Sequence, residues 1–278
     1  MAFFLRSSWP LVIGLLGTML VSQANAAFEK RVALVIGNSA YAHAVALRNP
    51  VNDAMAMNEK LQSLGFVTVA GFDLDRRGME KAIRDFVLLA QDASLAAFFY
   101  AGHGIAVNGT NYLIPVDGKF ADATALDFEA IPVDLVTRHM GTERAVGLVF
   151  LDACRNNPLA ENLARSMGTT SRSIGIENGL AEMRVADGGK GLAIAFATSP
   201  GSVALDGADT RHSPFTESLL QHIGKPNTDI TQMMSLVTGD VFEKTRQKQR
   251  PWLNTSLTGP VVLNAVMGDV SAPVGSQG

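Results

Sequence analysis

One histidine and one cysteine stand out by residue type and position. His103 lies between Gly102 and Gly104 directly after an apolar run, and glycine neighbours let the backbone approach a ligand closely. Cys154, the only cysteine of the chain, follows another apolar run. A neutral imidazole near a thiol can stabilise the thiolate as a nucleophile and later protonate a leaving group. The pair predicts a Cys-His dyad, with the backbone N–H groups of Gly104 and Cys154 forming an oxyanion hole.

Each of these residues has a simpler interpretation when it is taken alone. A lone histidine is more often satisfied within a loop, and a lone cysteine is more often a buried, inert side chain. Their combination favours catalysis, because each follows a predicted core strand and the histidine lies roughly 50 residues upstream of the cysteine. A metal site fits less well, since the remaining histidines lack ligand spacing. We interpret these as surface or core residues: His43, His139, His212 and His222.

The elements that must position the dyad alternate between strand and helix patterns. Apolar, β-branched runs predict buried strands at 31–37, 66–70, 95–100, 146–151 and 192–197. Helical spacing of apolar residues predicts one helix capped by Asn52 and Asp53 and a second over 79–90. This alternation implies a parallel sheet, whose active crevice lies at the carboxyl ends of the strands. We also expect a last strand at 261–266 and a small surface hairpin at Asn108-Gly109.

Length and charge bound the classes of protein that the chain can belong to. Its 278 residues fit one large α/β domain or two small ones. A formal net charge of −3 offers no basic field for phosphates, which argues against nucleic acid as a partner. A nucleotide-binding sheet enzyme is a weak alternative, because the first strand ends in Gly37-Asn-Ser-Ala and not in a glycine-rich phosphate motif.

The segment 1–26 has the pattern of a cleaved signal peptide. Arg6 precedes an apolar run over 11–21, and Ala24-Asn25-Ala26 matches the small-x-small pattern of signal peptidase sites. The run is shorter than the ~20 residues that a spanning helix needs. We therefore expect an exported protein, periplasmic or secreted, without stable membrane insertion. An uncleaved N-terminal anchor is the alternative.

A series of motifs in fixed order extends from about residue 30 to residue 263. It includes Tyr100-Ala-Gly-His-Gly104 and Leu151-Asp-Ala-Cys-Arg-Asn-Asn-Pro158, and it continues in Ser213-Pro-Phe-Thr216 and Gln249-Arg-Pro-Trp252. This order resembles the caspase-like cysteine peptidases of the peptidase C14 type, and within them the bacterial metacaspase-like branch, the orthocaspases. The ordered set is specific, whereas no single motif is.

The resemblance implies a caspase-like three-layer α/β/α sandwich with a mostly parallel central sheet of about six strands. It also identifies His103 and Cys154 as the catalytic dyad. The peptidase domain would cover 27–268, followed by a disordered tail over 269–278. Its parts would be a large-subunit-like part over about 30–157, a loop over 158–191 and a small-subunit-like part over 192–266.

An acidic residue two positions before the cysteine suggests which bond is cleaved. Strand alternation puts Asp152 on the same side as Cys154, and a carboxylate there favours Arg or Lys before the scissile bond. Animal caspases instead carry Gln-Ala-Cys-Arg-Gly at this point. The resemblance adds Asp53 as the second wall of a basic-specific S1 pocket, although Asp53 also suits a helix N-cap. Asp206 is a further candidate for the cleft, with a turn-forming Asp-Gly as its default interpretation.

The segment 158–191 is rich in Gly, Ser, Arg and Asn and is interpreted as a long, mobile loop. Its basic residues offer sites at which the enzyme could cut itself: Arg165, Arg172, Arg184 and Lys190. An ordinary solvated loop is the alternative.

Nothing in the sequence requires a cofactor. The family often uses calcium, yet no Asp-x-Asp-x-Asp-Gly loop is present, so calcium remains possible. The resemblance favours a monomer, because metacaspase-like enzymes are usually monomers. The sequence therefore predicts a cysteine endopeptidase that cleaves proteins or peptides after Arg or Lys. Self-cleavage in the segment 158–191 is part of this hypothesis. The alternative is a non-catalytic caspase-like module that binds peptides or proteins, since a fold does not guarantee a function.

Overall fold

Strands and helices alternate along the part of the chain that carries the site. A computed structural model describes residues 30–122, 124–154, 161, 163–164, 176–177, 180–183, 189–200, 204–207 and 210–266. The expected signal peptide, the C-terminal segment 269–278 expected to be a disordered tail, and most of the segment 158–191 lie outside the described residues. The strands are β1 (Arg31–Gly37), β2 (Phe66–Phe72), β3 (Leu95–Val107), β4 (Thr110–Leu113), β5 (Ile131–Pro132), β6 (Val146–Cys154), β7 (Ile176–Glu177), β8 (Leu192–Phe196) and β9 (Trp252–Thr255). The helices are α1 (Pro50–Ser63), α2 (Arg76–Ala90), α3 (Ala125–Glu129), α4 (Asp134–Thr137), α6 (Pro214–His222) and α7 (Ile230–Lys244).

The central sheet has the strand order β2-β1-β3-β6-β8-β9. Every pair along this path is parallel except β8 and β9, which are antiparallel. The short strands β4 and β7 pair with the long end of β3, and β5 pairs with β4. The prediction of a mostly parallel sheet of about six strands is confirmed.

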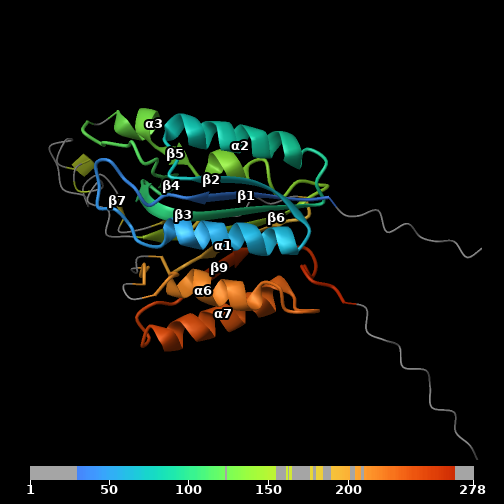
Figure 1. Cartoon of the computed structure of the whole chain (residues 1–278). Coiled ribbons are helices and arrows are strands. Elements are labelled where there is room, and N and C mark those ends of the chain that lie inside the picture. The colour runs from blue at the N-terminus through green and yellow to red at the C-terminus, as the bar shows by residue number, and fades with distance from the viewer. Residues whose placement is uncertain are drawn as a thin grey trace, which may run out of the picture.

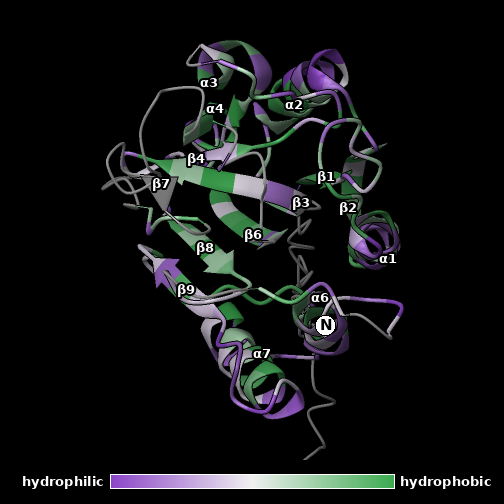
Figure 2. Cartoon of the chain, turned by 90° about the vertical axis from the view of Figure 1, so that its left-hand side faces the viewer, coloured by the Kyte–Doolittle hydropathy of each residue, from purple (hydrophilic) through white to green (hydrophobic). Residues whose placement is uncertain are grey.

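Helices cover both faces of this sheet (Figure 1). On one face α2 packs Ile83 and Phe86 against β1 and β3. On the other face α1, α6 and α7 contribute Met57, Phe215 and Val237 to a second buried cluster. In Figure 2 the strands β6 and β8 are hydrophobic, whereas the helices carry both hydrophobic and hydrophilic residues. The sheet is therefore buried on both faces, as parallel sheets with crossover helices are.

Helix α1 begins earlier than the sequence predicts. Asn49 is its N-cap, and Pro50 takes the first helical position, where proline's fixed φ fits and its missing N–H is not needed. Asn52 and Asp53 consequently lie within the helix, and the prediction that they cap it is wrong. The Asp53 side chain is instead buried, with 1% of its surface exposed.

The last strand of the sheet is also not where the sequence predicts it. β9 (Trp252–Thr255) pairs with β8, while in 261–266 Val262 forms a single bridge to Asp229. Asp229 caps α7, its carboxylate accepts the Val261 N–H, and Ile230 N–H is donated to the Val261 carbonyl. The segment 261–266 binds the N-terminus of α7 and forms no ladder with the sheet, so the prediction of a strand there is wrong.

The hairpin is present but is not a separate surface feature. Asn108 and Gly109 have φ of 50° and 77°, which suits a two-residue type I′ turn. The strand before the turn is the buried end of β3, and Ile105 and Val107 belong to a third apolar cluster. The hairpin therefore extends the carboxyl end of β3 beyond the rest of the parallel sheet.

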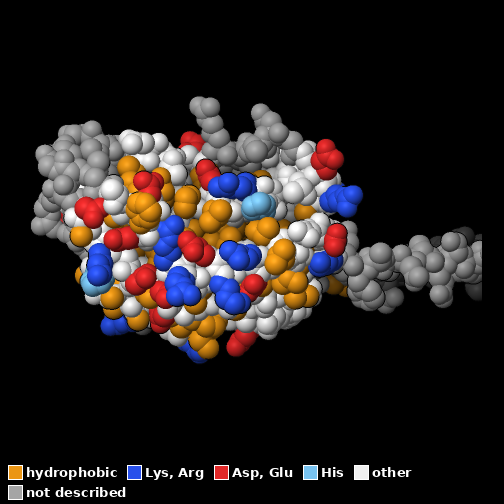
Figure 3. Space-filling model, turned by 90° about the horizontal axis from the view of Figure 1, so that it is seen from above, with side chains coloured by type: hydrophobic (Ala, Val, Ile, Leu, Met, Phe, Trp, Pro, Cys, Tyr) orange, Lys and Arg blue, Asp and Glu red, His pale blue; other side chains and the backbone are white. Residues whose placement is uncertain are grey.

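The surface over α2 carries charges of both signs among scattered hydrophobic side chains (Figure 3). Ion pairs one helical turn apart join Arg76 to Glu80 and Lys81 to Asp85 on this helix. Among the helices in the described residues, none has the length and apolar character needed to span a bilayer.

Candidate active site

His103 and Cys154 are direct neighbours across two central strands. β3 and β6 run in parallel in a register that pairs Tyr100 with Leu151 and His103 with Cys154. Neighbouring strands lie about 4.8 Å apart, so the backbones of the two residues are adjacent. Both residues lie at the carboxyl end of the sheet, where open parallel sheets place their active crevices. The side chain of Cys154 lies outside what the structure describes.

The imidazole of His103 is buried and held in one orientation. Its Nε2 lies 2.9 Å from the backbone carbonyl oxygen of Val45, and its ring centroid lies 4.4 Å from that of Tyr41. A carbonyl oxygen only accepts hydrogen bonds, so Nε2 carries the proton in the neutral ring and Nδ1 carries the lone pair. Among the described residues the buried Nδ1 has no hydrogen-bond partner.

Burial also sets the charge of this imidazole. Desolvation lowers the pKa of His103, although the Val45 carbonyl acts in the opposite direction. The ring is therefore neutral at pH 7 and has a nitrogen able to accept a proton. This is the form that a general base for a neighbouring thiol requires.

The pairing of β3 with β4 orients the N–H group of Gly104. Directly opposed residues of an antiparallel pair alternate between hydrogen-bonded and non-bonded pairs. Counting from the two-residue turn, Val107–Thr110 and Ile105–Tyr112 are the bonded pairs, and Gly104–Leu113 is not. The Gly104 N–H therefore points away from β4, toward the β6 side of β3. A Cβ at position 104 would lie 3.1 Å from that of Ala153.

Asp152 turns from β6 toward the N-terminus of α6. Its Oδ2 accepts hydrogen bonds from the hydroxyl of Ser213 and from that of Thr216, the latter at 2.7 Å. Ser213 is the N-cap of α6 and itself accepts the N–H of Thr216 at 2.9 Å. The capping residue thus holds the helix and the Asp152 carboxylate at once.

Asp53 reaches the same point from α1. The backbone N–H of Ser213 lies 3.3 Å from both of its carboxylate oxygens, and Nδ1 of His212 lies 2.8 Å from Oδ1. Ser213 therefore connects Asp53, through its N–H, with Asp152, through its hydroxyl. Interpreting His212 as a surface or core residue misses its contact with Asp53.

Asp206 lies beside this pair, in the connection between β8 and α6. Its Oδ2 accepts the backbone N–H of Arg48 at 2.9 Å, and Gly207 after it has a φ of 77°, as an Asp-Gly turn requires. Asp206 is both a turn residue and a third acid of the cluster, because its charge acts on Asp53 and Asp152. Asp53, Asp152 and Asp206 are called the pocket carboxylates below.

The pocket carboxylates resist ionisation. Burial, and then the charge of Asp152, raise the pKa of Asp53 to about 9. Burial raises the pKa of Asp152 to about 6, although the two hydroxyl donors favour its charged form. Burial raises the pKa of Asp206 as well, against the N–H donors of Arg48 and Asn49. An entering cation would relieve this destabilisation, because it favours the charged form of each acid.

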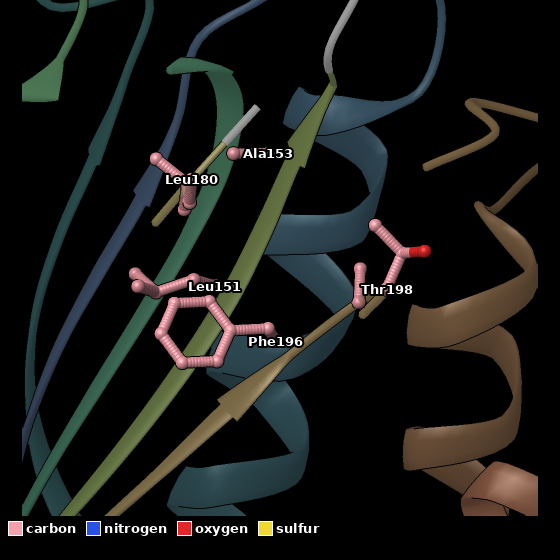
Figure 4. A pocket seen from close by; sticks show the side chains of 6 residues that line it. Leu151, Ala153, Leu180, Phe196 and Thr198 are labelled. Carbon is pink, nitrogen blue, oxygen red and sulfur yellow. The ribbon is translucent and has the colours of Figure 1, made fainter. Parts of the chain in front are cut away.

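An apolar recess lies on the opposite face of the sheet from these acids. It is lined by side chains that include Leu151, Ala153, Leu180, Phe196 and Thr198 (Figure 4). Leu180 belongs to the segment 158–191, for which the sequence predicts a long, mobile loop. Its next residue, Ala181, exchanges two hydrogen bonds with the side chain of Asn111, at 2.6 and 2.8 Å. The described residues 180–183 form no helix or strand, and Leu180, Ala181 and Met183 are buried beside β3 and β6.

The sequence predictions place five side chains in the site, and the structure brings three of them together as the pocket carboxylates. The surrounding groups were not predicted, although Ser213 and Thr216 stand in a motif used for the family resemblance. A Ser directly before a Pro at the first helical position is the helix-start signal that could have found Ser213. Among the described residues no group of three or more His, Cys, Asp or Glu is arranged to hold a metal ion.

Comparisons with known proteins agree with this architecture. Over 89 residues, which are 32% of the chain, the sequence is 34% identical to mucosa-associated lymphoid tissue lymphoma translocation protein 1 of Homo sapiens. The Mus musculus homologue of that protein matches to the same extent. The match spans 11% of each of those longer proteins.

Solved structures share the fold over most of the chain. Caspase-1 of Spodoptera frugiperda superposes with a TM-score of 0.58 and 17% identity, covering 86% of this chain and 92% of that chain. A structural-genomics protein of Geobacter sulfurreducens gives a TM-score of 0.61 and 17% identity over 83% and 94% of the two chains. The caspase-domain model of peptidase family C14 matches residues 30–262, from the start of β1 to beyond β9. The chain belongs to the caspase-domain family.

Proposed function

We propose that this protein is a cysteine endopeptidase that cleaves peptide bonds after Arg or Lys. The observation that carries the proposal is the pair of buried acids next to the dyad strands. In the described part of the chain neither Asp53 nor Asp152 forms an ion pair with Lys or Arg. Buried carboxylates are normally paired with a cation. The His212 imidazole beside Asp53 has its pKa lowered by burial, so two acids converging on Ser213 indicate a site for a cation that arrives with the substrate.

The pocket lies close to the nucleophile because Asp152 and Cys154 are on the same strand, β6. Asp152 and Cys154 are two residues apart, which is about 6.6 Å along a strand. A substrate whose scissile carbonyl lies at Cys154 can therefore direct the side chain of the preceding residue toward Asp152 and Asp53. An Arg or Lys side chain gains charge-assisted hydrogen bonds there, whereas an Asp side chain meets like charge.

The chemistry follows from the neutral His103. Its Nδ1 takes the thiol proton of Cys154, and the thiolate attacks the scissile carbonyl carbon. The N–H groups of Gly104 and Cys154 stabilise the oxyanion. The imidazolium then gives its proton to the departing amine, leaving a thioester on Cys154. Water, deprotonated by His103, hydrolyses the thioester and releases the acid product and the free thiol.

The proposal extends to the segment 158–191 as a site of self-cleavage. Asn111 holds residue 181 close to the dyad strands, and basic residues flank this point in the sequence, with Arg184 after it and Arg172 before it. Cutting there would release Leu180 from the recess. The proposed enzyme is exported and monomeric.

The experiment compares peptides that differ only at the residue before the scissile bond. Fluorogenic substrates with Arg, Lys, citrulline or Asp at this position are assayed with the wild-type protein and Cys154→Ala. We expect cleavage after Arg and Lys alone and none by the variant. Citrulline has the shape of Arg without its charge, so equal cleavage of the Arg and citrulline peptides would contradict the role of the pocket carboxylates. Equal rates for the two proteins would contradict the role of Cys154.

A further inference from the structure

The backbone N–H of His103 is bonded to the hydroxyl of Tyr41 and not to a strand. Strand β1 accompanies β3 as far as the pair Gly37–Ala101, and the N–H of Asn38 still binds the Ala101 carbonyl at 2.9 Å. Backbone groups of a strand face the same neighbour every second residue, so those of His103 also face this side. There β1 has ended, and the N–H of His103 is donated instead to the Tyr41 hydroxyl at 2.7 Å.

The carbonyl of His103 accepts hydrogen bonds from the backbone N–H of Ile114, at 3.1 Å, and from a second tyrosine. The Tyr100 hydroxyl donates to it at 2.7 Å and lies 3.4 Å from the Tyr41 hydroxyl. A phenol has one proton to donate, so Tyr41 is the donor when the two hydroxyls bond. The contacts run from the His103 N–H through Tyr41 and Tyr100 back to the His103 carbonyl. This ring begins and ends on the peptide groups of the residue that carries the imidazole.

Tyr41 also contacts the imidazole itself. Its ring packs against that of His103 at 51° between the planes, and only 7% of Tyr41 is exposed. The contact removes water from one side of the imidazole and contributes to the burial that lowers the pKa of His103. One side chain thus fixes both the backbone and the ring of His103.

The loop that carries Tyr41 is itself anchored. The N–H groups of Ser39 and Ala40 are donated to Oδ1 of Asp73 at 2.7 and 2.9 Å, and the N–H of Ala42 to the Val116 carbonyl at 2.8 Å. A few residues later the same loop presents the Val45 carbonyl to Nε2 of His103. Tyr41 is therefore held in place independently of the histidine.

The close fit at Gly102 shows how little space the arrangement leaves. A Cβ at this position would lie 2.6 Å from the Tyr41 hydroxyl oxygen and 2.7 Å from that of Tyr100. Both distances are well below van der Waals contact. Any side chain at 102 would push the two hydroxyls off the peptide groups of His103.

We propose that Tyr41 is a positioning residue for His103, which sets the orientation of the imidazole toward the nucleophile. The inference rests on the proposed function of His103 as the base of a cysteine peptidase. Tyr41 does not touch the reacting atoms; it acts through the backbone and the ring of His103. Losing its hydroxyl leaves a buried N–H without a partner at the residue whose position sets the rate of proton transfer.

The test removes the hydroxyl alone, with Tyr41→Phe. The chain has three tyrosines, so Tyr112→Phe on β4 is the matched control. We expect kcat on an Arg peptide to fall roughly 10- to 100-fold in Tyr41→Phe, with KM unchanged within about twofold. Tyr112→Phe should retain the wild-type kcat. A kcat for Tyr41→Phe equal to that of the control would overturn the proposal, as would a change confined to KM.

A second measurement needs neither turnover nor a folded variant. Hydrogen exchange by NMR in the wild-type protein should show the His103 amide protected like amides of the central sheet. Rapid exchange of this amide would contradict the contact with Tyr41 and overturn the proposal. If peptides are not cleaved but the His103 amide is protected, the proposed function fails and the contact stands. If peptides are cleaved and Tyr41→Phe behaves like the control, the inference alone fails.

Discussion

Replacing Asp53 by Asn should make the empty protein more stable and the enzyme less active. The Asn amide has nearly the shape of the protonated carboxyl and can accept from the Ser213 N–H as Asp53 does. It does not carry the charge that burial and Asp152 make unfavourable. One substitution should thus raise the stability and lower the activity. A variant that is merely damaged would lose both, so it would not match the prediction.

The stability effect has a defined dependence on pH. The pKa of Asp53 is raised from 3.8 to about 9 in the folded protein. A raised pKa means that stability present below pH 4 is lost as the pH rises toward 9, because the unfolded chain ionises first. At 1.36 kcal/mol per pH unit the loss at neutral pH is on the order of 1–4 kcal/mol. The variant lacks this loss, and its Tm should exceed the wild-type Tm by at least about 3 °C at pH 8.

The activity effect follows from the loss of one charge-assisted contact. Such a hydrogen bond contributes about 1.5–3 kcal/mol, which corresponds to a decrease of roughly 10- to 150-fold in kcat/KM for an Arg peptide. The assay combines thermal unfolding at pH 5 and pH 8 with hydrolysis of Arg and citrulline peptides. The variant should cleave the Arg peptide more slowly and should narrow the difference between the two peptides.

The control for this variant is Asp85→Asn on α2. Asp85 pairs with Lys81 at the surface, and exposed pairs contribute about 0–1 kcal/mol, so neither Tm nor kcat/KM should change appreciably. The reasoning is refuted if Asp53→Asn lowers the Tm at pH 8, if its Tm difference from wild type shrinks between pH 5 and pH 8, or if kcat/KM for Arg is unchanged.

Three further changes test other parts of the site. Asp206→Asn should lower kcat/KM for Arg peptides by about 2- to 10-fold, less than Asp53→Asn, because Asp206 is less buried and the Arg48 N–H already stabilises its charge. Asn111→Ala removes both hydrogen bonds to residue 181, and gel electrophoresis should show faster self-cleavage in 158–191. An unchanged rate would show that the contact between Asn111 and residue 181 does not control self-cleavage. Oxidation by peroxide should abolish activity and a thiol reductant should restore it, since a lone cysteine has no partner for a protective disulfide; persisting activity would argue against a thiolate nucleophile.

The sequence predicts the central sheet well because its strands have an unambiguous pattern. Runs such as 31–37 and 146–151 are apolar, β-branched and too short for helices, so one interpretation remains. The segment 261–266 has a similar composition, yet the backbone of Val261 forms hydrogen bonds with the N-terminus of α7. Composition alone cannot distinguish pairing with a strand from pairing with a helix end, because both satisfy backbone N–H and C=O groups.

The site is predicted only where its residues follow strands. His103 and Cys154 come directly after apolar runs, and their adjacency follows from the parallel sheet. Tyr41, His212 and Ser213 lie in loops or at a helix start, and their roles depend on where the chain returns in space. Asp53 was predictable only in part. Its residue type and the family resemblance identify it as a pocket residue, but only the start of the helix at Pro50 shows that it is not a cap.

The most direct test of the account uses the single cysteine as its own label. The protein is treated with a peptidyl-arginyl acyloxymethyl ketone and, in parallel, with the matched aspartyl compound, and its intact mass is measured. The account predicts one covalent adduct per chain with the arginyl compound, mapped to Cys154, and none with the aspartyl compound. An adduct with the aspartyl compound alone, or no adduct at Cys154 with either, would contradict a basic-specific pocket beside a cysteine nucleophile.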